Sequence, residues 1–312
     1  MSSFSLASKN GAIEYVRGRQ GKDGGYLFYQ YEDIFESAVD DTFYALSVLK
    51  SLGVEPPNSK LTLKFLRSKI ADTSLYTAYY STNAFNILGT RLRFSKRLLD
   101  FVSSLRRDQG IFGKLRKHKA MRNDDIPKNE EISPNYESSE IFEIELPSEL
   151  ELAFMVLNCH KKLGLKISEN GKQDLAESVF NYLRPDGGFG SNASDINSTF
   201  YALRTLNLLD CPMESLWNTS EWILGLEDKN GGFNVSHRSR FRTVEYTYKA
   251  VEGLKMFRGR PKLRMIHTTF LLQCQNGNGG FRRSIFAGIS TLKDTFEAVT
   301  TLESLLGSSE NE

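Results

Sequence analysis

The feature that most constrains this chain is an eight-residue phrase that recurs along it. The clear copies start with Thr, carry an aromatic residue second and Ala fourth, and end with Leu. The copies occupy residues 42–49, 199–206, 247–254 and 295–302, with weaker copies at 81–88 and 150–157. Apolar positions fall at helical spacing in all of them, so we expect six related helices.

The spacing of the copies leaves room for a second helix in each unit. From residue 150 onward, successive copies begin 49, 48 and 48 residues apart. A period near 48 residues holds two helices of ordinary length and their loops. Segments with a suitable apolar pattern occupy residues 12–19, 61–70, 98–105, 175–183, 216–226 and 263–272. The sequence therefore predicts an all-α chain of about six helical hairpins.

Glycine-rich turns separate the hairpins. They read Asp/Asn-Gly-Gly-aromatic at residues 23–26, 186–189, 230–233 and 278–281, with a degraded copy at 108–112. Glycine permits positive φ, and Asp or Asn side chains stabilise turns by bonding to nearby backbone groups. We interpret these segments as structural turns rather than phosphate loops, because no Gly-x-x-x-x-Gly-Lys pattern is present.

Composition excludes several classes of protein. The 312 residues are 40% hydrophobic and 25% charged with a net charge of +2, which is typical of a globular domain without a basic nucleic-acid footprint. Three Cys residues are too few and too scattered for a disulfide framework. We find no signal peptide and no apolar stretch near the roughly 18 residues of a membrane span, and expect a cytoplasmic protein.

The chain is predicted to be one domain, residues 1–312, with one interruption. Residues 114–147 combine mixed charge with three Pro residues and break the repeat. We predict a flexible surface loop there, since long segments without periodicity inside a compact domain are exposed connections.

Six hairpins joined by Gly-Gly-aromatic turns resemble the α/α toroid of protein prenyltransferase β subunits and terpenoid cyclases. The resemblance covers nearly the whole chain apart from the insertion, and its most specific segments are residues 83–90 and 275–281. It implies an inner ring of helices inside an outer ring, around an aromatic funnel that holds an isoprenoid; aromatic residues make up 12% of this chain. The candidate lining residues are Phe43, Tyr80, Phe200, Tyr248 and Phe296, with Tyr79 and Tyr246 on the same helices.

The zinc ligands of the prenyltransferases are not retained. The resemblance places the family's Asp and Cys ligands at Thr243 and Glu245, and its His ligand at Asp294. Zinc prefers His and Cys, so we expect no zinc and no metal site here. A zinc-independent transferase would then use Glu245 or Asp294 to orient the acceptor, and Mg²⁺ stays open as a cofactor.

A group of basic side chains matches the family's diphosphate clamp. In the family, Arg and Lys residues before the fifth phrase act with a neighbouring Tyr, and a family His falls on Asp195 here. The candidate diphosphate-binding residues are His237, Arg238, Arg240, Tyr246, Arg282 and Arg283. Guanidinium groups form charge-assisted bonds with phosphate oxygens, so these residues favour a polyprenyl diphosphate as ligand.

A second reading of the resemblance is a class II terpenoid cyclase. Those enzymes carry Asp-x-Asp-Asp-Thr, of which residues 38–42 keep the last three positions. Asp40 matches the proton donor and Asp41 follows it. Burial and like-charge neighbours raise a carboxyl pKa and suit it to protonate an alkene. The simpler role of Asp41 and Asp294, each directly before a phrase, is to cap a helix.

Two further alternatives stay open. The chain would serve as a non-catalytic isoprenoid carrier or scaffold subunit if it binds a prenyl ligand without consuming it. Six-hairpin toroids also host sugar enzymes with paired carboxylates, although two Trp residues in the chain offer little sugar stacking. Our leading prediction is a zinc-independent prenyl-transfer enzyme, and the resemblance implies a helical-repeat partner similar to the family's α subunit.

Overall fold

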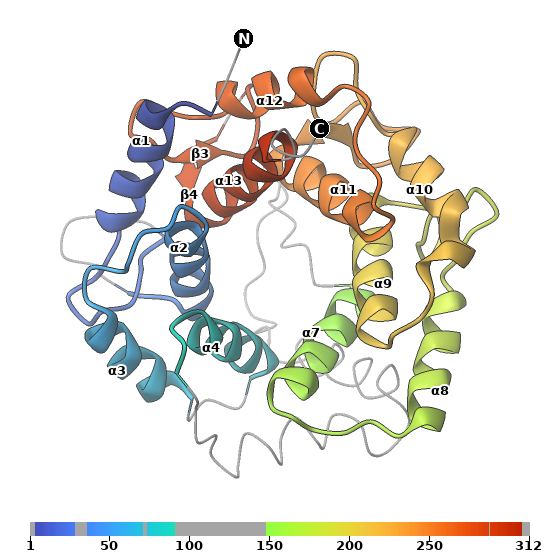
Figure 1. Cartoon of the computed structure of the whole chain (residues 1–312), viewed down its shortest axis with the longest axis horizontal. Helices are drawn as coiled ribbons and strands as arrows, with labels where there is room; N and C mark the ends of the chain where they lie inside the picture. The colour runs from blue at the N-terminus through green and yellow to red at the C-terminus, as the bar shows by residue number, and fades with distance from the viewer. Residues whose placement is uncertain (1–3, 29–35, 71–73, 91–147, 287, 308–312) are drawn as a thin grey trace, which may run out of the picture.

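The computed structural model describes residues 4–28, 36–70, 74–90, 148–286 and 288–307, in which the helices form two concentric rings (Figure 1). The inner ring consists of α2 (Val39–Ser51), α4 (Leu75–Ile87), α7 (Glu149–Lys162), α9 (Ile196–Leu208), α11 (Val244–Met256) and α13 (Leu292–Leu306). The outer ring holds α1 (Leu6–Arg17), α3 (Ser59–Lys69), α8 (Glu169–Phe180), α10 (Trp217–Leu224), preceded by the 3₁₀ turn η1 (Met213–Leu216), and α12 (Arg264–Gln273).

The inner ring closes on itself. Going around, α2 packs against α4, then α7, α9, α11 and α13 follow, and α13 packs back against α2. All six copies of the sequence phrase lie on these inner helices, so the predicted all-α toroid is confirmed. The expected outer helix at 98–105, the degraded turn at 108–112 and the insertion at 114–147 lie outside the described residues.

The Thr that begins each clear copy of the phrase accepts a hydrogen bond from the turn before it. In the fifth unit the Phe233 backbone N–H donates to the Thr247 hydroxyl at 3.1 Å. The same bond joins the turn aromatic to the phrase Thr in three other units, at 2.9–3.0 Å. These turn aromatics are fully buried. Each Gly-Gly-aromatic turn is therefore fastened to the inner helix that follows it, as expected for a structural turn.

The first glycine of each turn is required by backbone geometry. At Gly231 φ is 95°, and a Cβ there would lie 2.8 Å from the Ile266 carbonyl oxygen on the outer helix α12. After two of the turns, short antiparallel ribbons lead into the next inner helix. These are β1 (Phe233–Asn234) with β2 (Arg242–Thr243), and β3 (Phe281–Arg282) with β4 (Ser290–Thr291).

Four of the inner helices, α2, α9, α11 and α13, begin three residues before their copy of the phrase. Asp195, Thr243 and Thr291 are the N-caps of α9, α11 and α13, and their side-chain oxygens accept from the amide three residues later at 2.8, 3.1 and 2.9 Å. The expected capping role of Asp41 and Asp294 is therefore wrong, because each is the third residue inside its helix. Within the described ranges, no helix combines the length and apolar character needed to cross a bilayer.

Candidate functional site

Seven aromatic rings form a closed circuit inside the inner helical ring. Neighbouring ring centroids in this circuit lie 5.3–6.5 Å apart, a spacing typical of interacting aromatic pairs. In order, the circuit runs through Phe43, Phe296, Tyr248, Phe200, Tyr201, Phe154 and Tyr79, and back to Phe43. All six inner helices contribute at least one ring.

These rings line a cavity of about 960 Å³ that is walled mainly by the N-terminal halves of the inner helices. This volume falls within the range of small-molecule sites. The five predicted lining residues, Phe43, Tyr80, Phe200, Tyr248 and Phe296, all contact it. Tyr79 does so as well, whereas Tyr246 is buried in the core outside the cavity lining.

The sequence-predicted carboxylates differ in where they lie. Asp40, Asp41 and Glu245 all line the cavity. Burial, together with the neighbouring Asp40 charge, raises the pKa of Asp41 to about 7, against the opposing effect of Arg19. Asp294 is buried beside the cavity without lining it, and accepts a 2.7 Å bond from the Thr291 hydroxyl. Burial raises its pKa to about 6.

Glu245 is held by two lysines. Its Oε1 atom accepts from Lys249 Nζ at 2.8 Å and lies 3.0 Å from Lys293 Nζ. Lys249 also donates to Asn197 Oδ1 at 2.7 Å. Burial would raise the pKa of Glu245, but the two ammonium groups outweigh it and lower that pKa. Glu245 is therefore an ionised carboxylate that ties α11 to α13.

Zinc does not fit the residues at the family's ligand positions. Thr243 uses its hydroxyl to cap α11, and Glu245 is already neutralised by two lysines. The third position, Asp294, is bonded to Thr291. Across the part of the chain that the structure describes, no cluster of three or more His, Cys, Asp or Glu side chains is placed to hold a metal ion.

Glu297 is a cavity carboxyl that sequence reasoning missed. It is only 3% exposed, it lines the cavity, and its Oε2 atom has no hydrogen-bond partner in the described chain. Burial raises its pKa to about 8; Glu245 and Asp294 act in the same direction, while Lys293 and Lys249 oppose them. Its Oε1 atom lies 4.0 Å from Lys293 Nζ, and the raised pKa favours the protonated form of this carboxyl more than for an ordinary Glu.

Arg204 is a second missed residue. Its guanidinium lies over the rings of Phe154 and Phe200, 5.1 and 5.7 Å from their centroids. It lines the cavity and forms no ion pair with the described residues. Arg204 therefore adds a positive charge on the aromatic wall of the cavity, at a different place from the lysines of α11 and α13.

The predicted diphosphate clamp is not gathered in one place. Arg283 lines the cavity. Arg282 donates to the Ile285 carbonyl of its own loop and to the Gln273 carbonyl at the end of α12. His237 lies against Trp222 with ring centroids 5.4 Å apart. Arg238 and Arg240 are exposed and do not line the cavity, and Tyr246 is buried in the core.

Two charged cavity residues that sequence reasoning missed, Lys249 and Glu297, share the third position of the phrase. The third residue is Tyr in the copies at 42–49 and 199–206, but Lys249 and Glu297 in the last two copies. All of these third residues line the cavity. The sequence did contain a signal for these residues. At one position of the repeat, a charged residue replaces an aromatic one.

Comparison with protein families identifies the fold. The family model for the prenyltransferase alpha-alpha toroid domain matches residues 1–125 and 135–305. The chain therefore belongs to this family. Comparison with curated proteins gave no match.

Solved structures with the same fold include both enzyme types suggested by the sequence. Candida albicans protein geranylgeranyltransferase-I complexed with GGPP aligns with a TM-score of 0.64 and 16% identity, over 95% of this chain and 90% of that chain. The type II terpene cyclase MstE from Scytonema aligns with a TM-score of 0.55 and 11% identity, over 96% and 97%. A variant of the same cyclase, in complex with geranylgeranyl dihydroxybenzoate, aligns with a TM-score of 0.53 and 11% identity, over 96% and 95%.

Proposed function

We propose that the protein binds an isoprenoid chain in its aromatic cavity. The observation that carries this proposal is the closed circuit of seven aromatic rings around a cavity of about 960 Å³. Such a surface removes an apolar chain from water at about 25 cal/mol per Å² of buried area. Its ring faces also stabilise a cation that forms along the chain. Two structures of the same fold hold ligands with a geranylgeranyl chain.

The cavity rim favours an anionic head group on that isoprenoid, as in a prenyl diphosphate. Lys249, Lys293 and Arg283 line the cavity, and α9, α11 and α13 begin there. Helix N-termini and cations together attract phosphate oxygens. Transfer of the prenyl group would then proceed by ionisation of the diphosphate, assisted by these cations. A zinc-independent reaction and a helical-repeat partner remain predictions.

Acid-initiated cyclisation is a second candidate, favoured by one specific observation. Asp41 lines the cavity with a pKa of about 7, so near neutral pH it holds a proton that an ordinary Asp would have lost. A protonated acid beside aromatic walls can donate to an alkene and leave the resulting cation on the ring faces. This reaction needs no diphosphate on the chain.

The first test measures thermal stability with GGPP, with geranylgeraniol and with inorganic diphosphate. A ligand at 100 times its Kd adds about 2.7 kcal/mol to the free energy of unfolding. We expect both prenyl ligands to stabilise the protein, and Phe296→Ala, which removes a circuit ring, to weaken that effect. Phe286→Ala is the matched control because Phe286 is 77% exposed and outside the cavity lining. Equal weakening by both variants, or no stabilisation of the unmodified protein, contradicts isoprenoid binding.

Two substitutions then separate the candidate reactions. If the head group is a diphosphate, GGPP stabilises more than geranylgeraniol, and Lys293→Met removes the difference. If Asp41 donates a proton, the unmodified protein converts geranylgeraniol or a related alkene to cyclic product, and Asp41→Asn abolishes that conversion. A Lys293→Met variant that keeps the full preference for GGPP argues against the transferase arrangement.

A further inference from the structure

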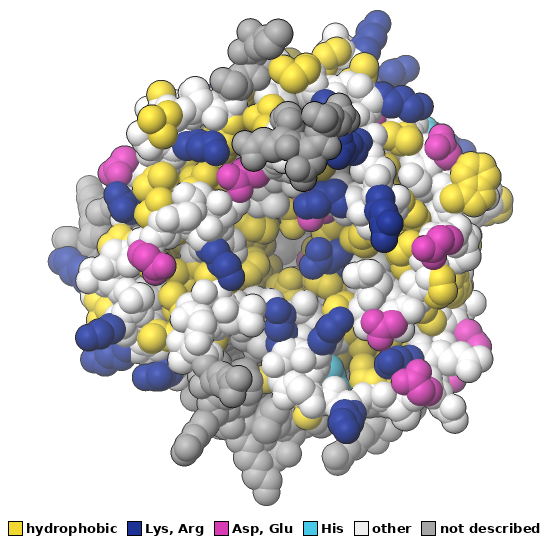
Figure 2. Space-filling model, in the orientation of Figure 1, with side chains coloured by type: hydrophobic (Ala, Val, Ile, Leu, Met, Phe, Trp, Pro, Cys, Tyr) yellow, Lys and Arg dark blue, Asp and Glu magenta, His cyan; other side chains and the backbone are white. Residues whose placement is uncertain are grey.

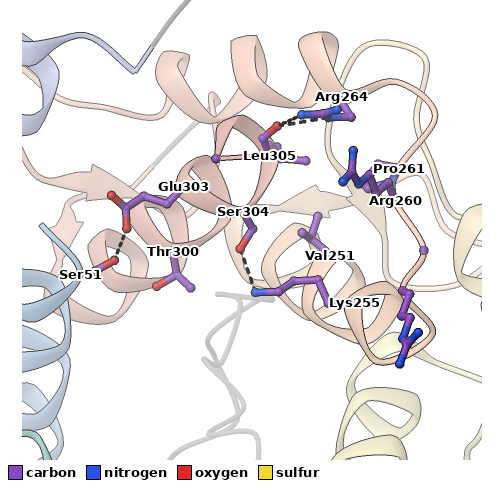
Figure 3. Close-up of a pocket in the computed structure, with 13 residues that line it drawn as sticks. Ser51, Val251, Lys255, Arg260, Pro261, Arg264, Thr300, Glu303, Ser304 and Leu305 are labelled. Carbon is purple, nitrogen blue, oxygen red and sulfur yellow. Dashed lines mark hydrogen bonds between the residues drawn. The ribbon is translucent and has the colours of Figure 1, made fainter. Parts of the chain in front are cut away.

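A second cavity of about 660 Å³ lies at the other end of the inner ring (Figure 3). Its walls come from the C-terminal ends of α11 and α13, the start of α12, the last residue of α2 and the connection between α11 and α12. On α11, Glu245 belongs to the aromatic cavity and Lys255 to this one, a separation of about 15 Å along the helix axis at 1.5 Å per residue. The two cavities share no lining residue.

Basic side chains dominate the second cavity. Four of them line it: Lys255, Arg258, Arg260 and Arg264. The only carboxylate in its lining, Glu303, is engaged by the Ser51 hydroxyl and lies 3.7 Å from Lys9 Nζ. In the space-filling view, Lys and Arg side chains gather over the end of α11 and its connection to α12, beside the central opening (Figure 2). The cavity therefore carries a net positive charge.

The four cations differ in how far the protein already uses them. Arg264 donates through Nε and Nη2 to the Leu305 carbonyl, and Lys255 donates to Glu252 at 2.7 Å and to Ser304 at 3.1 Å. These bonds fix the two side chains on the cavity wall (Figure 3). The side chains of Arg258 and Arg260 make no hydrogen bond or ion pair within the described chain. Two guanidinium groups are thus available to a ligand beside two that are held in place.

Arg258 occupies the left-handed position that ends an inner helix. Its φ is 55°, and the corresponding residues after α2, α4 and α7 are glycines with φ of 69°, 65° and 70°. The adjacent residue, Gly259, lines the same cavity. The chain thus places an unpaired Arg where a Gly would be less strained, and the side chain reaches a concave basic surface.

We infer that this second cavity binds a phosphate-bearing anion between Arg258, Arg260, Lys255 and Arg264. Guanidinium groups match the geometry of phosphate oxygens, and an ammonium group adds a compact charge. Buried Val251, Pro261 and Leu305 give the cavity an apolar floor that fits the organic part of a phosphate ester. The site is independent of the isoprenoid proposal because it lies at the opposite end of the ring.

The test is calorimetric titration with inorganic phosphate at low ionic strength. The charge-removing variant Arg258→Gln/Arg260→Gln is expected to weaken phosphate binding at least about tenfold, because it removes the two free charge-assisted donors. Lys64→Gln/Arg67→Gln is the matched control, since it removes the same charge from exposed positions on the outer helix α3. Exposure of all four residues leaves folding intact, which the thermal midpoints check.

Further arms separate this site from the aromatic cavity and identify the source of the phosphate. The phosphate binding that Arg258→Gln/Arg260→Gln weakens should persist in Lys293→Met, because Lys293 lines only the aromatic cavity. Unchanged binding in Arg258→Gln/Arg260→Gln, an equal loss in the α3 control, or disappearance of all phosphate binding in Lys293→Met would each overturn the inference. Phosphatidylcholine vesicles with phosphatidic acid form the last arm. Vesicle binding that disappears in the double variant assigns a lipid phosphate; phosphate binding without vesicle binding assigns a soluble ester.

Discussion

At the scale of single residues, the aromatic cavity holds carboxyl groups in opposite states. Glu245 is surrounded by ammonium groups and stays ionised, whereas Asp41 and Glu297 are buried without enough compensating charge and retain protons at unusually high pH. The same side-chain chemistry therefore supplies a fixed negative charge at one point and proton donors at others. Position in the ring decides which role each group takes.

Asp41 makes the stability of the fold depend on pH. Its folded-state pKa of about 7 exceeds the ordinary value of 3.8, so the folded chain binds this proton more tightly than the unfolded chain. The free energy of unfolding should therefore fall as pH rises from about 4 through 7. Asp41→Asn should stabilise the protein more at pH 8 than at pH 5, by on the order of 2 kcal/mol. Urea unfolding at both pH values measures this difference.

Asp174→Asn is the control for that experiment. Asp174 is exposed on the outer helix α8, away from Asp41, so its substitution should change stability little and nearly equally at the two pH values. A gain for Asp41→Asn that is the same at pH 5 and pH 8 would show that the buried carboxyl is not the titrating group.

Glu245 and Glu297 should respond in opposite ways to the same substitution. Glu245→Gln leaves two lysines without their shared carboxylate and should cost about 3 kcal/mol at pH 7. Glu297→Gln should be neutral or stabilising, because the Glu297 Oε2 atom has no partner to lose. Denaturant unfolding of the two variants under one condition compares them. Similar losses in both would contradict the assignment of a charged and a neutral carboxyl.

At the scale of elements, four of the units share one hydrogen bond between a glycine-rich turn and the inner helix that follows it. The Phe233 N–H would be a buried donor without an acceptor if Thr247 lost its hydroxyl. Thr247→Val should therefore lower the free energy of unfolding by about 1–3 kcal/mol. Thr269→Val is the comparison, because Thr269 lies on the exposed face of α12 and bonds the Met265 carbonyl of its own helix. If both variants lose the same stability, the bond between the turn and the inner helix contributes no special stability to the unit.

The elements also show how far the sequence could predict the fold. Helical periodicity and a fixed phrase identified all six inner helices, because those signals are local. The starts of the four inner helices that carry the clear copies were misjudged by about one turn. In α11 and α13, for example, the capping residues Thr243 and Thr291 stand four residues before the phrase. Because the helix starts were placed about one turn too late, Asp41 and Asp294 were predicted to be helix caps.

The candidate site was predicted only in part for a related reason. Four of the five predicted lining aromatics occupy the second phrase position and could be found by alignment of the copies. The contacts of Glu245 with Lys293, and of Arg204 with Phe154, join residues about 50 positions apart on neighbouring inner helices. Such pairs exist only once the ring is closed, so a pattern along one helix does not reveal them.

At the scale of the whole molecule, the toroid depends on a closure between its first and last units. The outer helix α1 lies against the turn that precedes β3, and Gln275 joins the two ends. Its Nε2 atom donates to the Ser8 carbonyl at 2.9 Å and to the Gly279 carbonyl at 2.9 Å. Together with the packing of α13 on α2, this contact turns a row of hairpins into a ring that encloses the aromatic cavity.

Gly279 is the residue at which this closure is tightest. Its φ is 86°, and a Cβ there would lie 2.1 Å from the Gly11 carbonyl oxygen of α1, a backbone atom that cannot turn away as a side chain can. Gly279→Ala should therefore lower the free energy of unfolding by about 2 kcal/mol or more, from left-handed strain and from separation of α1. Gly277→Ala, two residues earlier, meets open space and should change stability by about 0.5 kcal/mol or less.

Hydrogen exchange of the two variants shows which helices the substitution destabilises. If the closure holds the ring together, Gly279→Ala should speed exchange of α1 and α13 amides while α8 is unaffected. Equally faster amide exchange in all helices would instead mean that the strain is spread over the whole fold, and that the contact of α1 with the last unit does not open separately.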